Sequence, residues 1–368
     1  MAEPFVTVLI DTYNHERFIE QAISSVLEQD FPLSDAEIIV VDDGSTDRTP
    51  ELVRRFEPHV RLLRKKNGGQ ASAFNAGIPE ARGEIVAFLD GDDWWAPNKL
   101  SFVVDAMRRN PSLGIVGHGI TMVHLDGREQ SEILREGFRF RADTVEGARL
   151  FRLRRSFLGT SRMTIRSSLL QRIGPVPEAV LVQADEYLFT LAAALSDGQV
   201  LPDALTYYRY HDANRFQMSH YDPERIRAKQ VSLAALASSL GAELARHGID
   251  QQARKAITKI IHAEADQLRL QLGGGTPIET CRTEWTIYRV HNPKASAFRQ
   301  ALKLLRLSPA LVMPPRTYYA LRSAMLRSRV YRNARGQSPR NYSGSHVENT
   351  WRSPQEASDA LGDVGSRR

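Results

Sequence analysis

A chain of 368 residues has room for two domains, or for one large domain with an appendage. Its apolar share of 42%, its charged share of 25% and its net charge of +6 are ordinary for a globular protein. Because Cys281 is the only cysteine, an internal disulfide framework is excluded. The first residues lack a signal-peptide pattern, and no apolar run is long enough to span a bilayer. We therefore expect a cytoplasmic protein, or one held peripherally on the inner face of a membrane.

The first part of the chain alternates β-rich and amphipathic segments. We predict strands at Phe5–Ile10, Glu37–Val41, Val60–Leu63 and Ile85–Leu89, and helices at Glu16–Gln29, Thr49–Phe56 and Gln70–Ala81. This alternation is typical of a parallel sheet with helices on both faces. In such sheets the ligand binds beyond the carboxyl ends of the strands.

Polar clusters follow three of these strands, at Thr12–His15, Asp42–Asp47 and Asp90–Asp93. The last cluster packs three carboxylates behind a buried strand, where like charges repel and raise each other's pKa. A divalent cation relieves this repulsion, and Mg²⁺ typically takes one or two protein carboxylates plus substrate phosphates. Asp-Gly pairs are also common in plain turns. The convergence of three clusters at one edge of the sheet favours a nucleotide-type site over simple turns.

The later segments are patterned less strongly. We predict strands at Gly114–His124 and Leu158–Ile165, a hairpin turn at Asp126-Gly127, and helices from Pro97 to Arg109, at Ser167–Ile173, at Val231–Arg246 and at Ala253–Leu272. The stretch from Glu136 to Arg155 is basic and weakly patterned, and no chemistry is assigned to it. Three glycines at 273–275 break the helical region.

Several short motifs together resemble those of family-two glycosyltransferases, which have a GT-A-type fold. They are Asp11-Thr12-Tyr13-Asn14, Val41–Asp47, Asn67-Gly68-Gly69, Asn75-Ala76-Gly77 and Leu89–Asp93, in the family's order. Asp11 departs from the pattern, since the family often has proline there. The resemblance implies an α/β, Rossmann-like catalytic domain with a mainly parallel sheet at residues 1–221. A helical, basic region at 222–335 and a polar tail at 336–368, predicted to be disordered, would follow.

The resemblance also implies roles for individual residues. The first two loops would bind the base and ribose, and the Asp-x-Asp element would serve the diphosphate and its metal. The predicted nucleotide-binding residues are Thr12, Tyr13, Asn14, Asp42, Asp43, Asn67, Gly68 and Asp90. Asp92 and His211 would hold a Mn²⁺ or Mg²⁺ cofactor, and Arg209 would meet the diphosphate. Simpler interpretations stay open: Tyr13 as a packing residue, Gly68-Gly69 as a plain turn, and His211 as a hydrogen-bonded histidine.

In the resembled family, an Asp preceded by Glu at the head of a later helix is the catalytic base. Aligned on the following helix, this position is Asp185, with Ala184 in place of the preceding Glu. Glu186 is the reserve candidate for the base. An acid at this place would also favour the helix dipole without any catalytic role.

The resemblance implies a metal-dependent, inverting glycosyltransferase. It would move a sugar from a nucleotide-sugar donor, by preference a UDP-sugar, to a saccharide or lipid-linked acceptor in polysaccharide or glycan assembly. The alternative is a non-catalytic nucleotide-sugar-binding or membrane-scaffold protein of the same fold. The imperfect Ala184-Asp185-Glu186 element is the best support for that alternative.

The segment from Trp285 to Arg335 contains eleven Lys or Arg residues and no Asp or Glu. On a helix, Phe298, Ala301, Leu302 and Leu305 would form an apolar face, and Arg299, Lys303 and Arg306 a basic one. Such a helix could lie on an anionic membrane surface, or it could pack on the catalytic domain with its basic face in water. Nucleic acid is not expected as a partner, because no recognition motif accompanies the charge.

Overall fold

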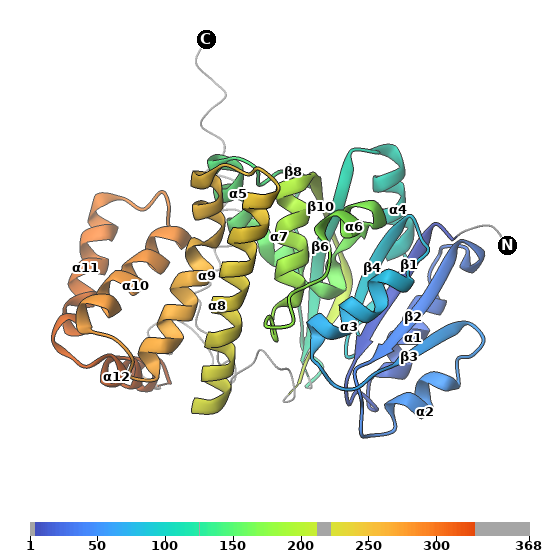
Figure 1. Cartoon of the computed structure of the whole chain (residues 1–368), viewed down its shortest axis with the longest axis horizontal. Helices are drawn as coiled ribbons and strands as arrows, with labels where there is room; N and C mark the ends of the chain where they lie inside the picture. Colours follow the sequence, from blue (N-terminus) through green and yellow to red (C-terminus); the bar gives the residue numbers. More distant parts are fainter. Residues whose placement is uncertain (1–3, 125, 212–221, 328–368) are drawn as a thin grey trace, which may run out of the picture.

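The computed structural model describes residues 4–124, 126–211 and 222–327, and the predicted tail at 336–368 lies outside them. One large sheet forms the centre of the first two thirds of the molecule (Figure 1). Its strands are β1 (Val6–Thr12), β2 (Ala36–Asp42), β3 (Val60–Arg64), β4 (Ile85–Asp90), β5 (Trp94–Trp95), β6 (Leu113–His124), β7 (Glu129–Glu132), β8 (Phe138–Phe140), β9 (Thr164–Arg166) and β10 (Asp197–Tyr210). They lie in the order β3-β2-β1-β4-β9-β6-β10-β5, with β7 on β6 and β8 on β10.

Helices cover both faces of this sheet, and five more extend the molecule on one side (Figure 1). The first group is α1 (Ile19–Leu27), α2 (Thr49–Arg54), α3 (Gln70–Gly77), α4 (Lys99–Arg109), α5 (Val145–Arg154), α6 (Ser167–Ile173) and α7 (Ala184–Leu195). The second group is α8 (Pro223–Arg246), α9 (Gln251–Gln271), α10 (Pro277–His291), α11 (Ala297–Val312) and α12 (Pro315–Arg327). The predicted α/β architecture with a helical C-terminal region is confirmed.

The central strands are parallel and buried on both faces. β1 pairs in parallel with β2 and with β4, and β2 pairs in parallel with β3. Successive residues of β1 from Val8 to Ile10 are fully buried, as expected when helices cover both sides of a strand. The apolar core on the α3 and α7 face continues without a break into α8 and α9, where Leu236 and Ile260 join it.

The strand predicted at Leu158–Ile165 is wrong. This segment forms two short 3-10 helices, Arg155–Leu158 and Thr160–Arg162, and only Thr164–Arg166 is extended. Its apolar residues are buried, as in a strand, but Gly159 separates the two turns and the polar side chains after it bond to neighbouring loops. The weakly patterned stretch before it contains β8 and α5.

None of the helices within the described ranges combines the length and the apolarity needed to cross a bilayer.

A buried acid connects the last three helices. The Glu284 side chain on α10 is 2% exposed and pairs with Arg322 of α12 and with Lys303 of α11. Burial by itself would raise the pKa of Glu284, but the two cations outweigh it and lower the pKa.

We expect Glu284→Gln to destabilise the protein by about 2 kcal/mol, because it leaves both cations without a counter-charge. The loss is below the ~3–5 kcal/mol of a fully buried pair, since Arg322 and Lys303 keep some contact with water. The lowered pKa means that this stabilisation is complete above pH 4.5 and is lost as the pH falls through the folded value. Urea titrations should therefore show the difference at neutral pH and a smaller one in acid. Exposed Glu224→Gln is the control; a shift in urea midpoint no larger than the control's would refute the tie.

Candidate active site

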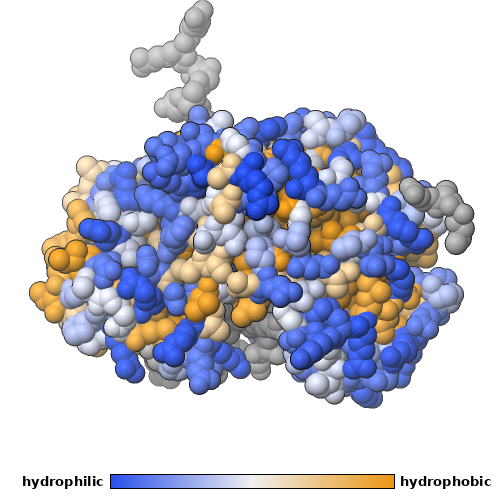
Figure 2. Space-filling view, viewed as in Figure 1, coloured by the Kyte–Doolittle hydropathy of each residue, from blue (hydrophilic) through white to orange (hydrophobic). Residues whose placement is uncertain are grey.

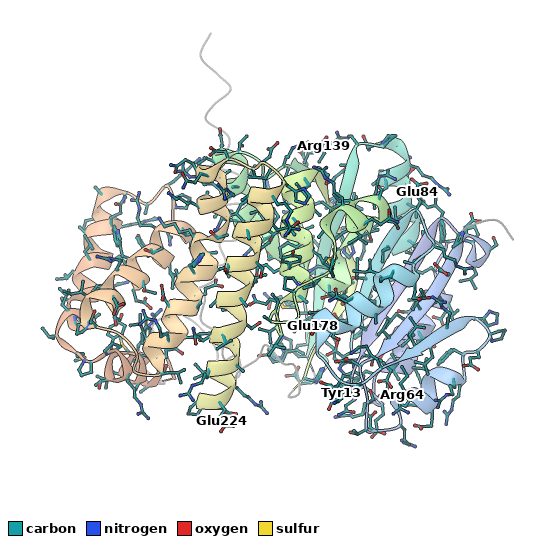
Figure 3. The ribbon with its side chains drawn as sticks, in the orientation of Figure 1. Tyr13, Arg64, Glu84, Arg139, Glu178 and Glu224 are labelled. Carbon is teal, nitrogen blue, oxygen red and sulfur yellow. The ribbon has the colours of Figure 1, made fainter. Side chains whose placement is uncertain are left out.

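The carboxyl ends of the parallel strands meet at one edge of the sheet. Thr12 of β1 lies in register with Asp42 of β2, and Asp11 lies in register with Asp90 of β4. Figure 3 shows Tyr13 and Arg64 at this edge and Glu84, which precedes β4, at the opposite one. The convergence of the three polar clusters predicted from the sequence is therefore confirmed.

Asn14 holds the first two loops together. It adopts the left-handed conformation, with φ of 56°. Its backbone N–H donates to Ser45 Oγ at 2.9 Å, and its side-chain oxygen accepts the Thr46 N–H at 2.8 Å. Thr12 is buried beside His15, whereas Tyr13 keeps part of its surface open. Tyr13 is the only aromatic residue among these three predicted nucleotide-binding residues, and it is partly exposed.

The two neighbouring acids of the second loop have different partners. Asp42 is fully buried, pairs with Arg64 at 3.1 Å and accepts the Ser45 N–H at 2.9 Å. Its carboxylate therefore stabilises the conformation of the loop that follows β2. Asp43 is nearly as buried, and its backbone N–H donates to the Thr12 carbonyl at 2.9 Å.

The Asp43 carboxylate holds the loop that follows β3 against the loop that follows β2. It accepts Lys65 Nζ at 2.8 Å and the N–H groups of Gly68 at 3.0 Å and Gly69 at 2.7 Å. These glycine amides are thus occupied by a protein carboxylate rather than turned toward a phosphate. Asn67, between them and Lys65, is exposed. The acid still has lone pairs to offer, since a carboxylate has about four acceptor sites.

Three acids lie at the end of β4 and directly after it, and they have different partners. Asp93 is 1% exposed and accepts the Ser161 hydroxyl at 2.6 Å and the Arg209 N–H at 3.0 Å, so it is bonded inside the protein. Asp90 accepts Gln70 Nε2 at 3.1 Å. Burial, followed by the charges of the neighbouring carboxylates, raises the pKa of Asp90 well above its ordinary value. Burial and the charge of Asp92 raise the pKa of Asp93 in the same way.

Asp92 faces two histidines. Its Oδ2 atom lies 3.0 Å from His211 Nε2 and 3.8 Å from His15 Nε2. Burial would raise the pKa of Asp92, but the hydrogen bond with His211 and the charges of both histidines outweigh burial and lower it. The hydrogen bond with His211 and the charges of the two histidines therefore favour the ionised form of Asp92.

The side chains of Asp92 and His211 could hold a cation together with the phosphates of a bound nucleotide. In the described part of the chain, no group of three or more His, Cys, Asp or Glu side chains forms a ready metal cage. Asp92 and His211 nevertheless bring one carboxylate and one imidazole to the same point. Mg²⁺ usually takes one or two protein carboxylates and completes its coordination with phosphates and water. The Asp92 carboxylate beside a diphosphate would match that coordination, and the His211 imidazole would add one nitrogen donor.

Arg209 is held rigidly next to Asp92. Its guanidinium lies 4.7 Å from the centre of the Phe18 ring and 4.4 Å from that of Trp94. Nε donates to the Asp92 carbonyl at 2.9 Å, and Nη2 donates to Gln21 at 2.6 Å. The predicted diphosphate residue and the two predicted metal residues are therefore brought together.

Asp185, the predicted base, lies at the N-terminus of α7. Its Oδ2 accepts the Thr160 N–H at 3.2 Å, and its Oδ1 accepts the Glu186 N–H at 2.8 Å. Gln70 Nε2 donates to Asp90 and also, at 3.2 Å, to the Thr160 hydroxyl. Asp90 and Asp185 are thus joined through Gln70 and Thr160. Burial raises the pKa of Asp185.

Glu186, the reserve candidate, is engaged elsewhere. It is 4% exposed, forms an ion pair with Arg155 and accepts Gln183 Nε2 at 3.1 Å. Arg155 also pairs with Glu264 of α9 at 3.3 Å. This arrangement makes Glu186 part of an internal ion-pair network and favours Asp185 as the group that meets a substrate.

Four residues that contact the site were missed in the sequence: Gln70, Thr160, Ser161 and Arg162. Three of them lie in the segment that was assigned to a strand. Arg162 pairs with Glu132 at 3.4 Å, and its charge also acts on Asp185. The signal that could have found them is a run of three polar residues, Thr-Ser-Arg, inside an otherwise apolar segment.

Comparison with known proteins agrees with this geometry. Residues 7–173 match the model of glycosyl transferase family 2. The chain carries a family 2 glycosyltransferase domain. An uncharacterized glycosyltransferase of Nostoc sp. is 32% identical over 216 residues, which are 57% of this chain and 66% of that protein. Uncharacterized glycosyltransferase EpsJ of Bacillus subtilis is 38% identical over 128 residues, 34% of this chain and 36% of that protein. The chain thus spans less than two thirds of these relatives.

A solved structure extends the likeness of fold beyond this domain. The structure of Staphylococcus aureus TarS 1–349 in complex with UDP-GlcNAc superposes with a TM-score of 0.56 at 19% identity, covering 91% of this chain and 93% of that one. In sequence, poly(ribitol-phosphate) β-N-acetylglucosaminyltransferase TarS of S. aureus is 27% identical over 208 residues, 55% of this chain and 35% of that protein. The fold of the family 2 domain and of the helical region is therefore shared.

Proposed function

We propose that this protein transfers a sugar from a UDP-sugar to an acceptor hydroxyl, with inversion at the anomeric carbon. The observation that carries the proposal is the hydrogen-bonded connection from Asp90 through Gln70 and Thr160 to Asp185. It joins the acids at the strand edge to the acid at the head of α7. A diphosphate at that edge and an acceptor hydroxyl at Asp185 would meet at the anomeric carbon between them.

In the proposed reaction, Asp185 removes the proton of the acceptor hydroxyl. The acceptor oxygen bonds to the anomeric carbon while the bond between that carbon and the diphosphate oxygen breaks, and UDP leaves with the electron pair. A base with a pKa raised by burial suits this task, because a proton acceptor works best when its pKa approaches the operating pH. A cation at Asp92 and His211 would neutralise charge on the diphosphate when bound.

The nucleotide would lie along the first two loops. The partly open ring of Tyr13 is suited to stack on the base, and the buried Asp43 to accept the imide N–H of uracil. Asp42 and Asn14 would act by holding the loops in place. The complex of the structurally similar TarS with UDP-GlcNAc supports a uridine nucleotide. We propose a saccharide or a lipid-linked saccharide as the acceptor, in glycan assembly.

We expect Asp43→Ala to weaken UDP binding by about 1–3 kcal/mol. Removing the carboxylate takes away an acceptor for the base and releases the amides of Gly68 and Gly69. Isothermal titration with Mn²⁺ and UDP measures the change, and Asp126→Ala, in an exposed turn, is the control. Unchanged affinity in a folded variant would place the base elsewhere.

The proposed activity is tested by following UDP release from a panel of nucleotide sugars with Mn²⁺, with and without saccharide acceptors. We expect slow hydrolysis of one UDP-sugar and faster turnover with the right acceptor. The scaffold alternative predicts binding without turnover across the whole panel. Thermal shift with the same donors identifies binding independently, since a ligand at a hundred times its Kd stabilises by about 2.7 kcal/mol.

A further inference from the structure

The helix α11 exposes the apolar stripe that its sequence would be expected to bury. Phe298 is 76%, Leu305 69% and Val312 81% exposed. These residues are seven positions apart, so they lie on one face of the helix, and Leu302 lies between them. Figure 2 shows hydrophobic surface at the end of the molecule where α11 lies in Figure 1.

The opposite side of α11 holds the helix on the protein. Leu307 and Ala310 are buried, and Lys303 reaches Glu284 of α10 at 3.6 Å. The expectation that Lys303 belongs to an outer basic face is therefore wrong, because a buried acid draws it inward. Arg299 and Arg306, also seven positions apart, remain exposed on the flank of the apolar stripe. Packing on the core thus uses neither the stripe nor these arginines.

The positive charge beside the apolar stripe indicates which kind of partner could bind there. The helix α11 carries Arg299, Lys303 and Arg306 and no Asp or Glu, and of these three only Lys303 pairs with the buried Glu284. A second copy of the chain would bring the same positive charge to the contact, and like charges across an interface are costly. Nucleic acid would satisfy the charge but leave the apolar stripe in water. A surface with apolar depth and negative headgroups satisfies both features.

We propose that α11 docks this protein on an anionic lipid surface, with Phe298, Leu305 and Val312 in the acyl boundary and Arg299 and Arg306 at the headgroups. The helix lies on the surface and does not cross it, since no described helix is suited to span a bilayer. The proposal is independent of the sugar transfer proposed above. It would bring the active site to acceptors held in a membrane.

The test uses the full chain and sedimentation with vesicles of phosphatidylcholine alone or of equal parts phosphatidylcholine and phosphatidylglycerol. We expect binding to the anionic vesicles only, weakened by salt because screening shortens the reach of the charges. Phe298→Ser with Leu305→Ser should lower the partition coefficient at least tenfold. Arg299→Gln with Arg306→Gln should lower it roughly twenty-fivefold at low salt, from about fivefold for each charge.

Leu33→Ser with Phe102→Ser is the matched control, because it removes one Leu and one Phe that are 43% and 42% exposed elsewhere on the molecule. It should bind vesicles like the parent protein. The α11 variants should keep the parent's unfolding midpoint, since their altered side chains are exposed. Full-length protein that ignores anionic vesicles at low salt would overturn the proposal. So would a stripe variant that binds as well as the control, or a parent dimer that the stripe variant abolishes in light scattering.

Discussion

Asp185→Asn should lower the rate of sugar transfer by about 10²–10⁴ and leave donor affinity unchanged. The asparagine side chain can keep the contact with Thr160 but cannot take a proton from the acceptor. Transfer rate and UDP affinity, measured side by side, separate the two effects. Because the base must be ionised, kcat/KM of the parent should fall as the pH drops through a pKa above the ordinary 3.8, and the variant should lack this limb.

Glu186→Gln is the contrast for this experiment. It breaks the ion pair with Arg155, so we expect lower stability but substantial transfer activity in the folded protein. A fully active Asp185→Asn beside an inactive, folded Glu186→Gln would move the base one residue along the chain. Loss of donor affinity in Asp185→Asn would instead assign this acid to nucleotide binding.

Asp92→Asn should remove the dependence of donor binding on Mn²⁺ and lower transfer by at least the same 10²-fold. The amide keeps the shape of the side chain but loses the charge that would meet a cation beside His211. Titration of UDP with and without Mn²⁺ is the direct measurement. The fold should survive, because the amide oxygen can still bond with His211 and the repulsion with Asp90 and Asp93 is relieved.

Asp93→Asn serves as the internal comparison for Asp92. Its carboxyl group is bonded to Ser161 and to the Arg209 backbone, so the change should affect stability and leave the Mn²⁺ requirement in place. If Asp92→Asn kept the parent's Mn²⁺-dependent affinity while Asp93→Asn lost it, the metal residue would be the second of the pair. Mn²⁺-dependent affinity equal to the parent's in both variants would exclude both acids as metal residues.

The strands and the edge at which they end could be predicted, because buried parallel strands are short apolar runs bounded by polar clusters. Thr12, Asp42 and Asp90 follow such runs directly, and strand register alone brings them together. The partners of each acid could not be predicted. Adjacent Asp92 and Asp93 look alike in the sequence, but in the turn between β4 and β5 the first side chain meets the histidines and the second bonds to Ser161 inside the protein.

The segment around Gly159 shows a second limit. Apolar residues at Phe157, Leu158 and Met163 fill the core from tight turns as well as they would from a strand, so burial alone did not distinguish the two. The helix α11 shows a third. Its spacing predicted an apolar face, but which face meets the protein depends on a tertiary partner, Glu284, that helical spacing does not reveal.

Arg155 connects the catalytic domain to the helical region next to Asp185, the proposed base. It pairs with Glu186 beside the proposed base and with Glu264 of α9, while the apolar core runs from the sheet into α8 and α9. The predicted boundary at residue 222 is therefore crossed by both charge and packing. If the helical region opened, Arg155 would lose its ion pair with Glu264 and would be held by Glu186 alone. The first turn of α7, which contains Glu186, would then fray. The amides of that turn should exchange with solvent at the rate of the helical region, so that Asp185, the proposed base, shares the stability of helices far along the chain.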